Sequence, residues 1–268
     1  MKLNKVERPG EQTHRYPPTV HLVEDTYACT LLARLSSGET HQPDINRLLD
    51  ELYRMLMRRV ISGTFPTEWA SCKTRMFEHV ESAAEFGYKG VHHETRAALV
   101  TMARAGNRPS DACFDLLNHL LVPDGVRQDH LMMARITDAD GRVTGVDISG
   151  SKIPGPVDGR VVLFADPMGA TGTSLSAAVR VYKEKVGGEP LKWIAMHLIV
   201  TPEHIRRMTD EHPEVEIWAF RLDRGLSPDY ILSSIPGESW DSEVGLTDNH
   251  YIVPGAGGLG EVINNADC

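Results

Sequence analysis

Cysteine is scarce in this 268-residue chain, and no two cysteines form a CxxC pair. The four are scattered at Cys29, Cys72, Cys113 and Cys268, which argues against both a zinc site and a disulfide framework. We expect reduced thiols, as in the cytoplasm. A chain of this length buries a sizeable core without such crosslinks.

Positive charge is also in short supply. Lys and Arg number 28 against 37 Asp and Glu, which gives a formal net charge of -9. A protein that binds nucleic acid usually carries a basic surplus that neutralises phosphates, so nucleic acid is not an expected partner. No apolar run approaches the length of a membrane span, and the polar residues 1–10 do not resemble a signal peptide. We therefore expect a cytoplasmic protein with no membrane partner.

Two signatures of hydrolases are missing. The 12 histidines include His92 and His93, but none has the HExxH spacing that would hold a zinc ion. Ser151 lies between Gly150 and Lys152 and not in a GxSxG elbow. Neither kind of hydrolase is supported, and no residue is assigned as a metal ligand.

The chain does contain strand-like runs that alternate with helical patterns. Strands are predicted at 97–102, 129–136, 142–148, 161–164, 193–200 and 215–220, and helices at 44–61, 109–121, 175–186 and from Thr201 onward. Such alternation predicts an α/β fold with a central, mostly parallel sheet covered by helices on both faces. We expect an N-terminal arm over 1–20 and a single domain over 21–268. Ligands of such sheets bind beyond the carboxyl ends of the strands.

The segment from Val161 to Ser174 carries the most specific chemistry. A buried strand ends at Asp166, a loop of small residues follows, and a helix then begins. The first amides of a helix lack partners within it and lie at the positive end of its dipole, where they bind anions. Asp166 would repel a phosphate, so its expected task is to accept hydrogen bonds from sugar hydroxyls. We predict a cradle for a phosphate monoester made by Pro167, Met168, Gly169, Ala170, Thr171, Gly172, Thr173 and Ser174.

Two arginines are expected at the same edge of the sheet. Arg104 and Arg135 each lie at the end of a predicted strand, on the ligand side. Arginine binds phosphate oxygens through two parallel hydrogen bonds. Either residue alone could equally form a surface ion pair, but two of them beside a phosphate cradle favour phosphate binding.

At these residues the sequence resembles the uracil phosphoribosyltransferases. The string Asp-Pro-Met-Gly-Ala-Thr-Gly-Thr-Ser at 166–174 is similar to their motif for phosphoribosyl pyrophosphate (PRPP), and Asp-Pro in place of two acids is typical of this subfamily. Residues 102–106 are similar to the loop that holds pyrophosphate, and Ala134-Arg135 to a further PRPP-binding step. The resemblance runs from about Val20 to Gly260.

The resemblance implies a type I phosphoribosyltransferase-like fold with a C-terminal hood that binds the base, in a homodimer or higher homo-oligomer. It implies transfer of the 5-phosphoribosyl group from PRPP to a pyrimidine base, most simply uracil, giving UMP and pyrophosphate. Mg²⁺ is the implied cofactor, and Arg104, Arg135 and Asp166 are the implied catalytic residues.

The C-terminal segment carries part of the resemblance. Residues 251–255 read Tyr-Ile-Val-Pro-Gly, the uracil-loop signature of the family. A glycine-rich loop can bind the edge of a base through its backbone amides and carbonyls. The residues that this assigns to the base are Tyr251, Ile252, Gly257, Gly258 and Leu259.

The same segment also departs from the family. Gly258 stands where the family has an aspartate that helps to hold PRPP and its metal, and Glu261-Val262 replaces a later Asp-Arg pair. Residues 227–250 form an insertion. One hypothesis is that a carboxylate from a nearby segment substitutes for the missing aspartate, the candidates being Asp223, Asp241 and Glu243.

These departures leave two alternatives to uracil open. The enzyme could transfer phosphoribose to a different heterocycle, which the altered loop and the insertion favour. It could instead be a non-catalytic nucleotide-binding regulator on the same scaffold, which the missing aspartate favours but the intact segment from Asp166 to Ser174 opposes.

Overall fold

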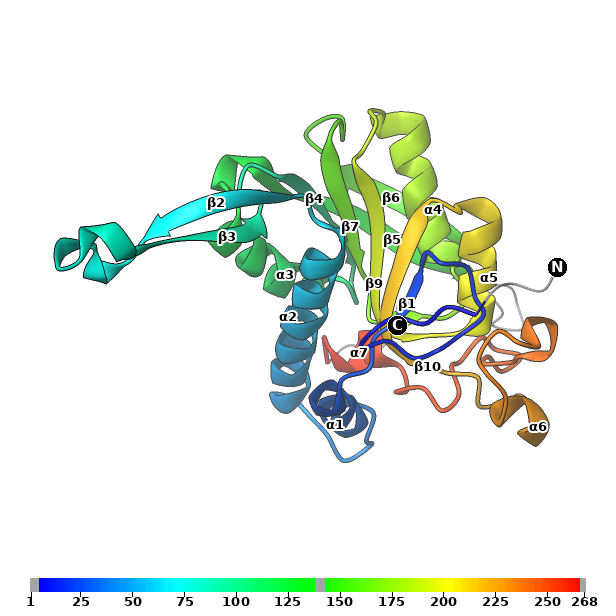
Figure 1. The fold of residues 1–268 in the computed structure, drawn as a ribbon. Coiled ribbons are helices and arrows are strands. Elements are labelled where there is room, and N and C mark those ends of the chain that lie inside the picture. The colour runs from blue at the N-terminus through cyan, green and yellow to red at the C-terminus, as the bar shows by residue number, and fades with distance from the viewer. Residues whose placement is uncertain (1–4, 138–142, 266–268) are drawn as a thin grey trace.

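An eight-stranded sheet forms the centre of the computed structural model, which describes residues 5–137 and 143–265 (Figure 1). The strand order is β1-β10-β9-β7-β4-β5-β6, with the short β8 paired to β9. All pairs are parallel except β5 and β6, which are antiparallel, so the predicted mostly parallel sheet is confirmed. The strands are β1 (Val20–Leu22), β4 (Arg96–Ala103), β5 (Val126–Thr137), β6 (Val143–Lys152), β7 (Arg160–Ala165), β8 (Met168–Gly169), β9 (Lys192–Val200) and β10 (Val215–Leu222).

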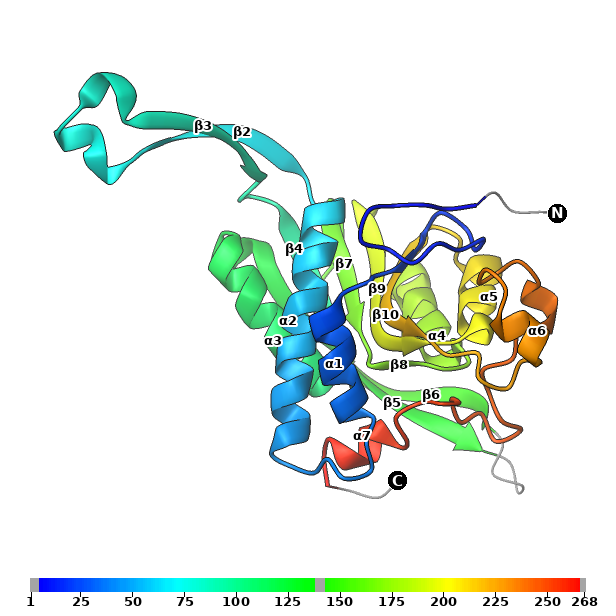
Figure 2. The same cartoon turned by 60° about the horizontal axis from the view of Figure 1, so that its bottom comes forward.

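Helices cover both faces of this sheet, as Figure 2 shows. One face packs on α1 (Thr26–Leu35), α2 (Asp44–Thr64) and α3 (Asn107–Leu120), and the other on α4 (Thr173–Val181) and α5 (Pro202–Glu211). Alternate side chains of a strand point to opposite faces. In β7, Leu163 joins the first core and Phe164 the second. All six residues of β7 are buried, which explains its unbroken apolar sequence.

The boundaries of the predicted elements shift by a few residues. Helix α2 continues through Gly63 to Thr64, and Gly63 lies so close to Trp218 that a Cβ at that position would come within 2.7 Å of the ring. Helix α3 begins two residues before Pro109. The strand predicted from Arg142 is β6, and Arg142 itself lies outside the described residues. Among the described helices, none combines the length and apolarity needed to cross a bilayer.

A two-stranded ribbon between α2 and β4 was not predicted. It consists of β2 (Thr67–Lys73) and β3 (Glu85–Val91), joined by 3-10 turns at Arg75–Glu78 and Glu81–Ala83. Figures 1 and 2 show it projecting away from the sheet. Most of its side chains are exposed on both faces, including Trp69 at 78%.

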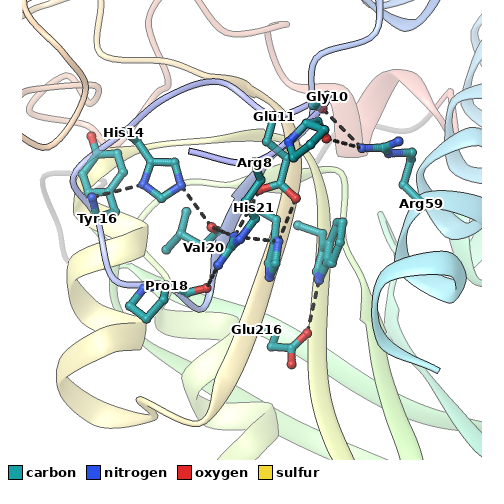
Figure 3. Close-up of polar contacts among 12 residues, drawn as sticks. Arg8, Gly10, Glu11, His14, Tyr16, Pro18, Val20, His21, Arg59 and Glu216 are labelled. Atoms are coloured by element: carbon teal, nitrogen blue, oxygen red, sulfur yellow. Dashed lines mark hydrogen bonds and ion pairs between the residues drawn. The ribbon is translucent and has the colours of Figure 1, made fainter. Parts of the chain in front are cut away.

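The N-terminal arm lies on the body of its own chain (Figure 3). Arg8 forms an ion pair with Glu11 at 3.1 Å, and Glu11 pairs with Val23 in an antiparallel bridge. Tyr16 is fully buried, and its hydroxyl donates a hydrogen bond to the carboxylate of Glu243. Glu243 lies in the 227–250 segment, which also contains α6 (Asp229–Leu232) and a 3-10 turn at Trp240–Ser242. The arm and this segment therefore brace each other.

Candidate active site

The loops predicted to bind phosphate groups meet at one edge of the sheet. Strands β4 and β7 are parallel neighbours, with Val100 opposite Phe164, so the loops that follow them start side by side. Gly106 allows close contact between these loops, because a Cβ there would lie 2.8 Å from the carbonyl oxygen of Ala165. This is the carboxyl edge, where open α/β sheets bind ligands.

The predicted catalytic residues lie on adjacent strands at this edge. Arg104 is exposed and directly follows β4, after a cis peptide bond with Ala103. Asp166 directly follows β7 and is half-buried. Arg135 lies in β5, three residues beyond Met132, which is the residue that pairs with Ala103 of β4. The backbone of Arg135 pairs with Val146 of β6. Arg104 and Asp166 are therefore brought together, whereas Arg135 lies further along the outer pair of strands.

A pocket opens at the predicted phosphate cradle. Seven of the nine residues from 166 to 174 line this pocket: Asp166, Met168, Ala170, Thr171, Gly172, Thr173 and Ser174. Leu175, His204 and His250 complete the lining. Pro167 and Gly169 are buried instead. The carbonyl of Pro167 accepts from the backbone of β9, and Gly169 pairs with Val200. These two residues fix the loop to the sheet.

The carbonyl groups of the cradle are turned toward α5. The backbone N–H of Thr201 donates to the carbonyl of Gly169 at 3.0 Å, and its hydroxyl donates to the carbonyl of Ala170 at 2.6 Å. Arg207 Nε donates to the carbonyl of Thr171 at 2.8 Å. In a trans peptide the N–H points opposite to the C=O. The amides of Thr171 and Gly172 therefore point away from α5, toward the pocket that both residues line.

The start of α4 is open. Gly172 precedes the helix with φ of +76° and provides no side-chain cap. The hydroxyl of Thr171 approaches the N–H of Thr173 at 3.3 Å, which is a long contact for a hydrogen bond. The positive end of the α4 dipole thus lies at the pocket that Thr171, Thr173 and Ser174 line, and the hydroxyls of Thr171 and Thr173 form a 2.9 Å hydrogen bond with each other. This arrangement suits a phosphate group.

Two buried histidines lie beneath the cradle. The Nδ1 atom of His197, in β9, is 2.6 Å from the carbonyl oxygen of Asp166. His204, in α5, packs edge-on against His197, with 4.5 Å between ring centroids. Burial lowers the pKa of His197 to about 4 and that of His204 well below 6.5, where His197 and Arg207 add a smaller effect. Both rings are therefore neutral at pH 7.

Sequence reasoning missed the contribution of α5. The helix predicted from Thr201 onward is α5, and the hydroxyl of Thr201 caps it by accepting a hydrogen bond from the N–H of His204 at 3.1 Å. Its bonds to the cradle, and those of Arg207, depend on residues more than 30 positions apart. The sequence contains no local signal for these contacts.

The C-terminal loop returns to the same edge. Asp223 anchors it by accepting hydrogen bonds from the N–H of Gly255 at 2.7 Å and from Arg221 at 2.6 and 2.9 Å. Arg221 also donates to the carbonyl of Gly255 at 2.8 Å. Helix α7 (Leu259–Val262) follows, and a Cβ on Gly260 would lie 3.5 Å from the Cβ of Ala105. The loop is thereby held beside the one that carries Arg104.

The residues assigned to the base lie along this loop. Tyr251 is 59% exposed and follows His250, which lines the cradle pocket. Ile252 packs against the core, and the side chain of Leu259 is buried in it. Gly257 is exposed with φ of +67°, and Gly258 precedes α7.

The three candidate substitutes for the missing aspartate already have partners. Asp223 holds Arg221 and Gly255, and Glu243 binds Arg224 at 2.7 Å as well as Tyr16. Asp241 forms an ion pair with Arg206 at 2.9 Å.

A fourth carboxylate is closer to the position in question. An ideal Cβ on Gly258 would lie only 1.7 Å from Oε2 of Glu261. The side chain of Glu261 therefore occupies the space that a side chain at 258 would need, a neighbour that sequence reasoning did not consider.

Comparison with known proteins decides the family. The family model described as uracil phosphoribosyltransferase matches residues 22–238. The chain belongs to the uracil phosphoribosyltransferase family. The resemblance drawn from the motifs is thus confirmed, and with it the assignment as an enzyme of the pentosyltransferase class.

Relatives within the uracil phosphoribosyltransferase family are distant. The chain is 30% identical over 223 residues to the uracil phosphoribosyltransferase of Variovorax paradoxus, covering 83% of this chain and 96% of that one. It is 28% identical over 210 residues to that of Mycoplasma genitalium, covering 78% and 84%. Among solved structures, the AQ2163 protein from Aquifex aeolicus has a TM-score of 0.68 at 20% identity, covering 91% of this chain and 97% of that one. This last similarity supports the fold.

Proposed function

We propose that this enzyme transfers the 5-phosphoribosyl group of PRPP to uracil, giving UMP and pyrophosphate. The open start of α4 carries the proposal, because the amides of Thr171 and Gly172 point toward a pocket that the helix start lines, while the carbonyls of the same loop bind α5. In this proposal the 5-phosphate binds at Ala170–Ser174, and Asp166 accepts hydrogen bonds from the ribose hydroxyls. Arg104 and Arg135 bind the pyrophosphate, and the 251–259 segment forms the hood over the base.

The reaction is a displacement at the anomeric carbon. A ring nitrogen of the base forms a bond to C1 of the ribose and releases its proton to solvent, while the bond from C1 to the pyrophosphate oxygen breaks. Positive charge develops on the ribose ring and negative charge on the leaving group. Arg104 stabilises the negative charge, and the cradle holds C1 in line by fixing the phosphate at the other end of the sugar.

Mg²⁺ is proposed to bind at this site as a partner of the substrate. Among residues 5–137 and 143–265, no group of three or more His, Cys, Asp or Glu could by itself hold a metal ion. Mg²⁺ typically takes one or two carboxylates and fills its remaining positions with water and substrate phosphates. Asp166 and Glu261 are the carboxylates proposed to hold it, and the ion would neutralise charge on the pyrophosphate.

A different heterocycle is the second candidate acceptor. Two features favour this second acceptor. The first is Glu261 beside Gly258, and the second is the 227–250 segment, which ends at His250 in the pocket. The two acceptors are separated by one experiment: incubation with PRPP, Mg²⁺ and a panel of bases, followed by release of pyrophosphate. Release with uracil supports the proposal, and release only with another base supports the second candidate. Binding of UMP or PRPP without turnover would instead indicate a regulator.

Arg104→Ala tests the assignment of the pyrophosphate loop. The product UMP lacks pyrophosphate, so the variant should lose turnover by far more than it loses affinity for UMP. Equal losses in both would contradict the role given to Arg104.

We also propose that the enzyme is a homodimer or higher homo-oligomer in the cytoplasm. The β2–β3 ribbon supports this, because Trp69, Phe86 and Tyr88 are 78%, 52% and 44% exposed on a projecting element. Exposed apolar side chains of this size are typical of contact surfaces. Sedimentation of the protein and of Trp69→Ser tests the idea; a monomeric wild type would refute it.

A further inference from the structure

His204 is a buried polar side chain for which the fold provides no partner. It is 1% exposed, and neither ring nitrogen has a hydrogen-bond partner within the described chain. Each of the other buried histidines of the described chain has at least one hydrogen-bond partner. His14 bonds to Val20 and Tyr16 (Figure 3), His197 to Asp166, and His212 to Ser176. A buried polar group without a partner costs stability. His204 therefore calls for an explanation other than packing.

The surroundings of His204 suggest where its partner comes from. His204 lines the same pocket as Thr171–Ser174. Gly169 makes room for it, since a Cβ there would come within 3.1 Å of His204 Nδ1. The histidine thus lies beside a helix start that already suits an anion.

We propose that His204 is a ligand-binding residue of this pocket, donating a hydrogen bond from its imidazole to the phosphoryl group held at the start of α4. The inference rests on the proposed function, in which that group is the 5-phosphate of the sugar. A neutral imidazole has one N–H to donate, and a phosphoryl group offers only acceptors at neutral pH. Hydrogen bonds to a charged acceptor are the stronger kind.

A pair of matched substitutions separates binding from packing. His204→Leu removes a polar group that has no partner, so its thermal midpoint should equal or exceed that of the wild type. Its affinity for ribose 5-phosphate should fall roughly tenfold or more. His14→Leu is the control: it loses the bonds to Val20 and Tyr16, so its midpoint should fall while its affinity for ribose 5-phosphate stays unchanged. His204→Asn, which restores a donor, should recover part of the affinity.

The wild-type protein provides a second readout that does not depend on a variant folding. Nitrogen-15 spectra of the histidine rings, recorded during titration with ribose 5-phosphate, should show a shift of the His204 nitrogens at the same concentration as binding. Unchanged His204 signals at saturation, or equal affinity of His204→Leu and wild type, would overturn the inference while leaving the cradle intact. If the wild type binds no phosphorylated pentose, both the inference and the proposed function fail.

Discussion

Asp223 allows a quantitative test of how the C-terminal loop is held. Its side chain is 1% exposed and accepts hydrogen bonds from Arg221 at 2.6 and 2.9 Å and from the N–H of Gly255 at 2.7 Å. Asp223→Ala would remove the charged partner of Arg221, which keeps the carbonyl of Gly255, and would leave the buried N–H of Gly255 without its acceptor. Removing one partner of a buried ion pair costs roughly 3–5 kcal/mol. For a chain of this size that corresponds to a fall of about 6–10 °C in the thermal midpoint.

The kinetic effect distinguishes an anchor from a metal ligand. A loosened loop should raise the KM for the base, with a smaller change in kcat. A lost metal ligand should instead lower kcat at saturating base, and excess Mg²⁺ should restore part of it. Thermal unfolding and steady-state release of pyrophosphate measure both effects.

Asp241→Asn is the control for the Asp223 variant. The side chain of Asp241 is 94% exposed, so its ion pair with Arg206 should contribute less than about 1 kcal/mol. An Asp223→Ala protein with the wild-type midpoint and base KM would refute the anchoring role.

Three further predictions follow from single sites. Gly172→Ala places a Cβ on a residue with φ of +76°, 3.2 Å from Arg207 Cδ. The free energy of unfolding should therefore fall by about 1–2 kcal/mol, and the affinity for ribose 5-phosphate should fall as well. Unchanged binding in a titration would contradict this. Glu261→Gln should raise several-fold the Mg²⁺ concentration needed for half-maximal turnover at an unchanged thermal midpoint, and an unchanged Mg²⁺ requirement would exclude Glu261 from the site. His197 has a pKa of about 4 when folded against 6.5 when unfolded, so the unfolded chain binds more protons between these values. The contribution of His197 to the free energy of unfolding, on the order of 3 kcal/mol, is therefore present above pH 6.5 and is lost as pH falls toward 4. Urea unfolding at pH 7.5 and at pH 5 should show this loss of stability, and the loss should be smaller in His197→Gln.

The strands of the central sheet could be predicted because burial on both faces leaves a strong pattern in the sequence. All six residues of β7 are buried, and eight of the nine in β9 are. The β2–β3 ribbon could not be predicted for the opposite reason. Its side chains are exposed on both faces, so neither an apolar run nor a period of two appears in its sequence.

The candidate site divides in a similar way. The pocket at 166–174 could be located from the sequence because its lining residues are consecutive between a strand and a helix. The contacts of Thr201 and Arg207 could not be, since these two residues bind carbonyls of a loop more than 30 positions away. His204 gives no sign of its position either, because a histidine within a helix has no distinctive pattern.

The C-terminal loop illustrates why a missing residue is hard to interpret from sequence alone. Gly258 suggested the loss of a carboxylate, yet the carboxylate of Glu261 lies 1.7 Å from the position that a Cβ on Gly258 would take. The two side chains compete for one volume, so an aspartate introduced at 258 must displace Glu261 and cannot simply add a second charge. If Gly258→Asp alone gave little gain in turnover, a carboxylate at this position could therefore still be important. The informative comparison pairs that substitution with Glu261→Ala, which empties the space first.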